Sequence, residues 1–411
     1  MSDFSYATPI LNRFLSYTEF DTMSDPHAAF RPSTPAQNDL LHAIEEDLHS
    51  MGFGDTTFLE TGYLIARIPA NVTRPVTPVA FMAHVDVADD VQGNGVKARV
   101  IERYDGNDVR LNETYTLTVQ DNPLLKKHTG STIVVTDGTT LLGADDKAGV
   151  AIIMALGEYI STHPEFEHGP IEFVFTSDEE TGEGMDAFDS SLLGAKVCYT
   201  IDGTQGGEVE AECFNAATVS VDFYGIPCHL GSARGKLVNS VSMASSFITM
   251  VPKNESPEAT DGRYGYYCAD DIKGTLEHTS VTFHLRDFER GELDRRIEAL
   301  KSLASTTEKL FPGGKVTVEE KIVYTNMADY IKKDPKVMES IFASGKEAHI
   351  ELQEKLIRGG TDGARLSAMG IPTPNIFTGG HNLHSRYEWL ALDDAVDCAS
   401  LITEIVRYWV K

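Results

Sequence analysis

Histidine and carboxylate side chains scattered along the chain are of the types that bind divalent cations and move protons. His84 and Asp86 stand two residues apart, so in an extended segment both side chains lie on the same face. A histidine that binds a metal through one ring nitrogen usually donates its other N–H to a carboxylate or a carbonyl, and Asp86 can fill that role. Taken alone, a histidine and an aspartate at this spacing are more often ordinary polar residues than a metal ligand and its partner.

Two pairs of adjacent acids add further carboxylates. Asp145 and Asp146 follow the apolar approach LLGA, and two acids are costly to bury without a partner such as a divalent cation. The alternative is an exposed acidic turn at the start of a helix near Lys147. Glu179 and Glu180 could divide two tasks, one binding metal and the other carrying a proton, or they could form a solvated loop.

Asp202 and, far downstream, His384 complete a set of oxygen and nitrogen ligands. Carboxylate and imidazole ligands with no cysteine nearby suit zinc, cobalt or manganese at a hydrolytic site. A serine or cysteine nucleophile is not supported, because the chain has no GxSxG motif. The residue types therefore favour metal-assisted hydrolysis.

Four short apolar runs must position these residues, because a polar cluster directly follows each of them. They are Val79–Ala83, Thr132–Thr136, Glu172–Thr176 and Val197–Ile201. Each run is short and rich in β-branched or aromatic residues, as buried strands are, and Lys147–Ser161 reads as a helix between them. The order predicts an α/β fold, a mainly parallel sheet with helices on both faces. Ligands bind such sheets beyond the carboxyl ends of the strands.

The pattern changes near Glu210, where alternating strands and amphipathic helices predict a smaller inserted α+β unit. The expected division is a catalytic domain over residues 1–209, an insertion over 210–324, and a return to the catalytic domain over 325–411. An N-terminal helix over Thr34–Met51, capped by Ser33 or Thr34, and a closing helix over Asp393–Val410, capped by its aspartate, are also predicted.

Composition narrows the class of protein. The length of 411 residues favours two domains, and no apolar run approaches the roughly 18 residues that span a bilayer. A formal charge of −27 disfavours nucleic acid and anionic membranes as partners. Five scattered cysteines without CxxC spacing argue against a disulfide framework and for a reducing compartment, and the N-terminus does not read as a signal peptide. A cytoplasmic location is expected.

The order HxD, GADDK, DEE, DG and GGHNLH along the chain closely resembles that of the co-catalytic di-zinc peptidase and aminoacylase superfamily, and within it the tripeptide aminopeptidases. The similarity extends over almost the whole chain, through LLGADDKAGV, TSDEET, YTIDG, FNAA, RGGTDGAR and TGGHNLHSRYE. The resemblance implies two Zn²⁺ ions, replaceable by Co²⁺ or Mn²⁺. It implies that His84 and Asp202 bind one ion, that Glu180 and His384 bind the second, and that Asp145 bridges both. It also implies that Asp86 orients His84 and that Glu179 is the general base for the water between the metals.

Two details of the resemblance concern neighbours of these residues. The family's bridging acid is the first of its pair, often joined to the next by a cis peptide, which favours Asp145 over Asp146. His384 is favoured over His381 because a small residue and then an acid follow it at the family's spacing, although Ser385 stands where the family usually has glycine.

In the inserted unit, the resemblance implies a lid on which His229 donates to the tetrahedral oxyanion. Cys228 and Leu230 are less typical neighbours for that histidine. Candidate clamps for the peptide carboxylate or carbonyls are Asn239, Arg286 and Arg358; for each of them, an ordinary structural hydrogen bond or salt bridge is an equal alternative.

The expected activity is that of a metallo-aminopeptidase that releases the N-terminal residue from short peptides, chiefly tripeptides. One rival is a related di-zinc amidohydrolase or dipeptidase acting on N-acyl amino acids or dipeptides. A second is a non-catalytic binding member, which would lack the base or a ligand, yet every expected position is filled. Short peptides are the expected partners, and a homodimer is compatible with the resemblance.

Overall fold

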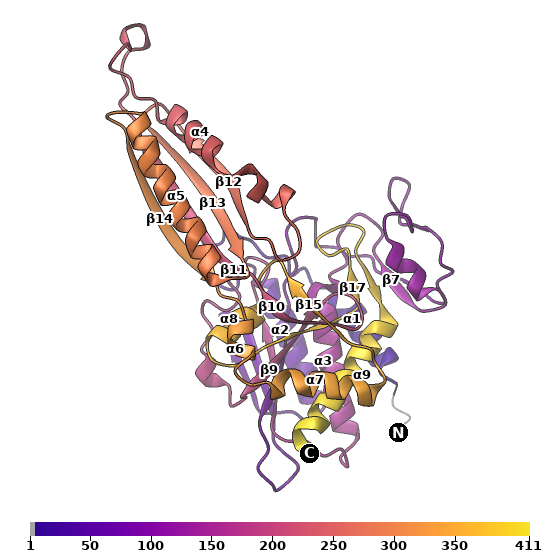
Figure 1. The fold of residues 1–411 in the computed structure, drawn as a ribbon. Helices are drawn as coiled ribbons and strands as arrows, with labels where there is room; N and C mark the ends of the chain where they lie inside the picture. The colour runs from indigo at the N-terminus through magenta and orange to yellow at the C-terminus, as the bar shows by residue number, and fades with distance from the viewer. Residues whose placement is uncertain (1–4) are drawn as a thin grey trace. The chain divides into compact units, whose positions relative to one another are not determined.

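A computed structural model describes residues 5–411, and these form two compact units (Figure 1). The larger unit comprises the chain up to Ala211 together with Asp329–Lys355 and Thr361–Lys411. The smaller unit comprises Glu212–Ala328 and a short later segment, Leu356–Gly360. The sequence predicted a single return near Tyr324, so the contribution of the later segment to the smaller unit was not foreseen.

The larger unit is built on an eight-stranded sheet with the order β1-β2-β8-β3-β9-β16-β10-β15. Its central strands β8, β3, β9 and β16 are parallel, and β1, β2 and β10 pair antiparallel around them. A mainly parallel sheet is thus confirmed for the centre only. The strands are β1 Thr56–Leu59, β2 Tyr63–Ile68, β3 Val79–His84, β8 Ile171–Thr176, β9 Val197–Gly203, β10 Glu208–Cys213, β15 Gln353–Ile357 and β16 Asn375–Phe377.

One predicted strand lies in a different sheet. The run Thr132–Thr136 does form a buried strand, β7 (Ile133–Val135), but β7 pairs antiparallel with β18 (Trp389–Ala391) and β4 (Arg99–Ile101). With β17 (Gly380–His381), these strands form a separate four-stranded sheet. An apolar run identifies a buried strand without specifying its partner, which explains the error. Two further short strands, β5 (Val109–Arg110) and β6 (Thr116–Leu117), pair with each other.

Helices cover the main sheet. Helix α3 packs on β3 and β9, and α1 and α9 pack on α3. The helices of this unit and its boundary are α1 Ala7–Tyr17, α2 Ala36–Ser50, α3 Ala144–Thr162, α6 Ala328–Ile331, α7 Lys336–Ala348, α8 Asp362–Ala368 and α9 Leu392–Val410. The predicted side-chain caps are wrong, because α2 begins after Pro35 and α9 after Ala391, neither with a side-chain cap bond. Among the described helices, none has the length and apolar character that crossing a membrane requires.

The smaller unit is an antiparallel sheet with the order β12-β13-β11-β14. Its strands are β11 Asn215–Tyr224, β12 Tyr266–Gly274, β13 His278–Asp287 and β14 Lys315–Tyr324, and its helices are α4 Ser240–Met250 and α5 Arg290–Leu310. Alternate residues of β11 and β13, such as Val219 and Phe283, pack against Phe247 of α4 and Ile297 of α5. The period-2 burial of the strands therefore creates one apolar face, which both helices cover.

Candidate metal centre

Three adjacent parallel strands bring the predicted ligands to one edge of the main sheet. His84 is the last residue of β3, Glu179 and Glu180 follow β8, and Asp202 lies near the end of β9. The strands are neighbours in the order β8-β3-β9 and run the same way, so their carboxyl ends coincide. Asp145, in the first turn of α3, enters the same cluster.

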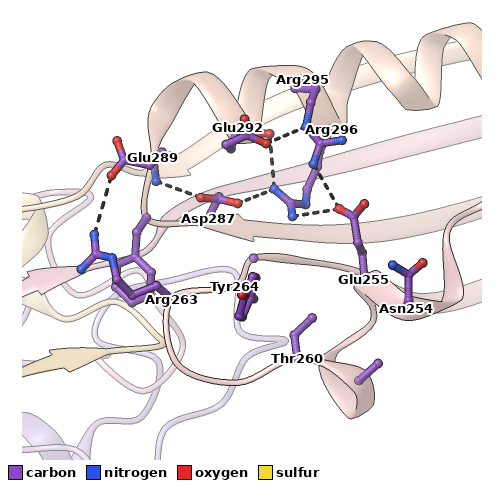
Figure 2. A pocket seen from close by; sticks show the side chains of 13 residues that line it. Asn254, Glu255, Thr260, Arg263, Tyr264, Asp287, Glu289, Glu292, Arg295 and Arg296 are labelled. Atoms are coloured by element: carbon purple, nitrogen blue, oxygen red, sulfur yellow. Dashed lines mark hydrogen bonds and ion pairs between the residues drawn. The ribbon is translucent and has the colours of Figure 1, made fainter.

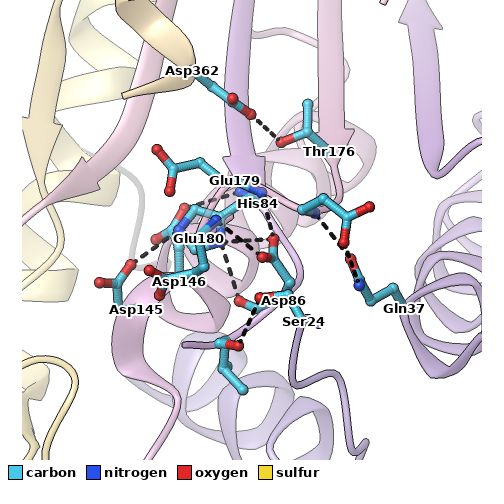
Figure 3. Close-up of polar contacts among 12 residues, drawn as sticks. Ser24, Gln37, His84, Asp86, Asp145, Asp146, Thr176, Glu179, Glu180 and Asp362 are labelled. Carbon is cyan, nitrogen blue, oxygen red and sulfur yellow. Dashed lines mark hydrogen bonds and ion pairs between the residues drawn. The ribbon is translucent and has the colours of Figure 1, made fainter. Parts of the chain in front are cut away.

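The carboxylate of Asp145 lies between His84 and His384, and Figure 3 shows it beside His84. Its Oδ1 is 3.0 Å from Nε2 of His84, and its Oδ2 is 3.3 Å from Nε2 of His384. Nε2 of His84 is also 3.5 Å from Oδ1 of Asp202, and Nε2 of His384 is 3.0 Å from Oε2 of Glu180. The residues thus form two triplets that share Asp145, and the ligand atoms within each triplet lie within 4.8 Å of one another. The peptide between Asp145 and Asp146 is cis.

The charged groups of this partly buried cluster shift one another's pKa values. Burial by itself disfavours a charged His84, but Asp202, Asp145 and Asp86 outweigh it and raise the pKa of the imidazole well above its usual value. Hydrogen bonds that the His384 ring donates to the carboxylates of Asp145 and Glu180 raise the pKa of the imidazole to about 11. Carboxylates therefore surround each imidazole, and their negative charge stabilises a positive charge at this place, either on the ring or on a bound cation.

The donor set fits a pair of divalent cations. Two imidazole nitrogens and three carboxylates, with no thiolate, are ligands of the kind that zinc accepts at hydrolytic sites. Oε1 of Glu180 is buried and has no hydrogen-bond partner among the described residues, which is costly for a carboxylate oxygen. A cation beside Glu180 would remove that cost.

Asp86 connects the histidine to the acidic loop. Its Oδ1 is 3.3 Å from Nδ1 of His84, and its two carboxylate oxygens accept the backbone N–H groups of Glu179 and Glu180, both at 3.1 Å. Nδ1 of His84 also lies 3.1 Å from the Asp86 carbonyl. A single fully buried carboxylate therefore fixes both the first histidine and the backbone of the two glutamates.

Glu179 lies beside the triplets and belongs to neither of them. Burial raises the pKa of its carboxyl well above the usual value, and the nearby charges of Asp202, Asp362 and Glu180 act in the same direction. Asp362 is held by a 2.7 Å hydrogen bond from Thr176 (Figure 3). A carboxylate of raised proton affinity next to a cation-binding cluster can act as a general base.

Sequence reasoning missed several residues that support the cluster. Asp90 lies 3.1 Å from Nδ1 of His384 and so orients that ring. Asp178, with φ of 59°, accepts hydrogen bonds from Ser33 and Gln37, which explains why Ser33 does not cap α2. Only the general rule that a ligating histidine has a carboxylate partner could have suggested Asp90, and it does not say which acid.

Glu388 holds the loop that precedes the bridging carboxylate. In the sequence, this residue served only to identify His384, because the family has an acid at this distance after its histidine ligand. In the structure, the buried side chain of Glu388 accepts hydrogen bonds from the N–H groups of Leu142, Gly143 and Asp145 at 2.6, 2.9 and 3.1 Å. Burial raises the pKa of this carboxyl to about 7. Glu388 therefore fixes the backbone at Asp145.

Glu388→Gln should weaken zinc binding by about 10–100-fold, the usual effect of losing a residue that orients metal ligands. The amide offers one acceptor oxygen where the carboxylate uses two, so the Asp145 loop loses part of its support. Competition with a chromophoric chelator would measure the affinity, with Glu347→Gln, exposed on α7, as control. Equal affinities in the two variants would show that Glu388 does not position Asp145.

The predicted substrate contacts all belong to the smaller unit, where the structure gives them local partners. His229 is exposed and accepts from the Gly231 N–H, and Asn239 caps α4 by accepting from Val241 N–H at 2.9 Å. Arg286 donates to the Leu285 carbonyl and lies over the ring of Tyr324. These contacts are all within the protein, so the proposed roles of the three residues in substrate binding stay predictions.

Arg358 makes structural hydrogen bonds, which is one of the two alternatives that the sequence left open for it. Its guanidinium donates to the carbonyls of Gly262, Tyr264 and Thr260 at 2.8–3.3 Å and so holds the loop beside a cavity of about 650 Å³. Figure 2 shows that cavity, which Arg263, Arg295 and Arg296 line together with four carboxylates. All three arginines already pair with glutamates or aspartates, namely Glu212, Glu255, Asp287, Glu289 and Glu292.

Comparisons with known proteins find related sequences and structures. Residues 134–408 match the model of peptidase family M20/M25/M40. A protein named Peptidase T from Geobacillus sp. (strain WCH70) is 41% identical over 400 residues, covering 97% of this chain and 98% of the relative. A second Peptidase T, from Clostridium perfringens (strain SM101 / Type A), is 42% identical over 399 residues, with the same coverage.

Two solved structures share the fold. An aminopeptidase from Bacillus cereus superposes with a TM-score of 0.78 at 22% identity, and a tripeptidase from Staphylococcus aureus with 0.79 at 19% identity. Each alignment covers 98% of this chain and 99% of the other. Because a family model matches most of the chain and close relatives match nearly all of it, this protein belongs to the peptidase family M20/M25/M40.

Proposed function

We propose that the chain is a metallo-aminopeptidase that releases the N-terminal residue from short peptides, chiefly tripeptides. The observation that carries the proposal is the pair of ligand triplets joined by Asp145, with Glu179 next to them. The relatives named Peptidase T, at 41% and 42% identity over nearly the full chain, support the same substrate class.

Two Zn²⁺ ions are the proposed cofactors, with Co²⁺ or Mn²⁺ as substitutes. His84 and Asp202 would hold one ion and Glu180 and His384 the other, and Asp145 would contact both. When bound, such a pair of cations lowers the pKa of a water molecule and polarises the scissile carbonyl.

The protein's own groups supply the proton transfers and the positioning. The Glu179 carboxylate accepts a proton from the attacking water and returns it to the leaving amine, a role that suits a group whose pKa burial has raised. Asp86 keeps the Glu179 backbone in place through its 3.1 Å hydrogen bond. His229, an imidazole exposed in the smaller unit, is the proposed donor to the tetrahedral oxyanion. Asn239, Arg286 and Arg358 are retained as candidate substrate contacts.

The test is hydrolysis of an unblocked tripeptide against its N-acetylated form by the zinc-loaded protein. An aminopeptidase requires the free amine, so only the unblocked peptide should be cleaved, with release of its first residue. Cleavage of the acetylated peptide at a comparable rate would instead identify an amidohydrolase and refute the proposal.

Zinc binding should release protons at pH 7 and should weaken as the pH falls. The carboxylates around the two rings raise the pKa of His84 well above its usual value and that of His384 to about 11 in the metal-free protein, and a protonated ring must lose its proton before it can ligate. Calorimetric titration with zinc in two buffers of different ionisation enthalpy would count the protons released. Identical heats in both buffers would show that the histidines bind metal without losing protons.

Two further proposals concern location and partners. The five cysteines of the chain are all free thiols, which supports a reducing compartment such as the cytoplasm. The formal charge of −27 supports small peptides, and not nucleic acid or membranes, as the molecules that the protein meets. A homodimer is the proposed assembly.

A further inference from the structure

A second cluster of metal-ligand side chains lies in the larger unit and shares no residue with the two triplets described above. It consists of His128 at the end of a short 3₁₀ helix (Pro123–His128), His381 on β17, and Asp394 in the first turn of α9. Each side chain offers one ligand atom, and these atoms lie within 4.8 Å of one another. Nε2 of His128 is 3.8 Å from Oδ2 of Asp394.

The cluster is buried and incompletely hydrogen-bonded. His128 and His381 are 7% and 6% exposed, and Nε2 of His381 has no hydrogen-bond partner among the described residues. Both rings pack on Trp389, which stacks on His381 at 4.0 Å between centroids. The indole N–H of Trp389 is also buried without an acceptor in the described part of the chain. Two orphaned polar groups around the same rings indicate an occupant that can satisfy them.

The electrostatic surroundings favour a cation as that occupant. Asp393 and Asp397 stand on the same helix as Asp394 and interact electrostatically with it. The opposing charge comes from Lys127, whose side chain belongs to an exposed residue and is screened by water. Burial lowers the pKa of His381 to about 3, which leaves its ring in the neutral form that ligates metals.

We propose that His128, His381 and Asp394 form a third metal site that binds one Zn²⁺ ion, with a water molecule as fourth ligand. Tetrahedral zinc with bonds of about 2.0–2.1 Å places its ligand atoms ~3.3 Å apart, so modest rotation of the three side chains closes the site. The bound water accepts the N–H of Trp389. The Gly206 N–H donates a 3.0 Å hydrogen bond to the Asp394 carboxylate and so orients it.

An ion at this site would link three segments of the larger unit. The ion ties the 3₁₀ helix, the β17–β18 hairpin and the start of α9 together, and His384 lies in the loop of that hairpin. The proposal concerns binding and stability and does not rest on the proposed peptidase activity.

The test compares wild-type protein, His128→Gln, Asp145→Ala and the double variant after zinc loading and desalting. Elemental analysis should find one ion per chain fewer in His128→Gln than in wild type, and one fewer in the double variant than in Asp145→Ala. Asp145→Ala removes the shared ligand of the two triplets, so it isolates the third site. With Co²⁺, Asp145→Ala should show the visible absorption of four-coordinate cobalt, and the double variant should lose it.

Asp394→Asn, on a different element, should lower the metal content as His128→Gln does, and circular dichroism establishes that each variant is folded. Equal metal content in Asp145→Ala and the double variant, with no cobalt absorption, would overturn the third site and leave a water molecule as its occupant. Failure of the paired-metal proposal would look different, because Asp145→Ala would then hold as many ions as wild type.

Discussion

Glu179→Gln should lower kcat by on the order of 10²–10⁴-fold, the contribution expected of a general base, without loss of metal. The amide has nearly the shape of the carboxylate but cannot take a proton from water at neutral pH. Glu179 is in neither ligand triplet, and the hydrogen bond from its backbone to Asp86 does not involve the side chain. The expected defect is therefore chemical, with the architecture of the site preserved.

Glu180→Gln is the matched control, because it makes the same chemical change at the next residue of the same loop. Oε2 of Glu180 lies 3.0 Å from His384, so this variant should lose metal as well as activity. Tripeptide turnover and zinc content, measured on the same samples, separate the two outcomes. Turnover near the wild-type value in Glu179→Gln would remove Glu179 from the role of base.

Strand ends made much of the site predictable from sequence. His84, Glu180 and Asp202 each follow or end a short apolar run, and parallel strands present such residues at one edge. Local patterns were enough here because burial and strand direction together determine where the next side chain lies. The same reasoning led to the central parallel strands of the main sheet.

Pairings between distant segments were not predictable in this way. Nothing near β7 in the sequence indicates that Trp389–Ala391 will pair with it. The antiparallel strands β1 and β2 also carry no pattern that distinguishes them from parallel strands. Likewise, Glu388 reaches the amides of Leu142–Asp145 and Asp90 reaches His384 only because the fold brings them together. A carboxylate that supports a ligand looks the same in the sequence as one on the surface.

The special position of Asp145 gives the last prediction, that Asp145→Ala loses both paired ions together with activity. Its two oxygens face different histidines at 3.0 and 3.3 Å, so alanine removes a ligand from each triplet at once. Four groups would remain, two for each ion, and none of them could replace the shared oxygen atoms. His84, which is buried, would then be left without its partner in Asp145, which is costly.

Asp146→Asn is the informative comparison, because Asp146 is adjacent and fully buried but lies outside both triplets. Its carboxylate accepts the N–H groups of His84 and Gly149, so its loss should reduce thermal stability more than metal content. Zinc analysis after exhaustive desalting distinguishes the two variants. Retention of both ions by Asp145→Ala would mean that the two histidines bind metal independently, and the argument for a shared, co-catalytic pair would fail.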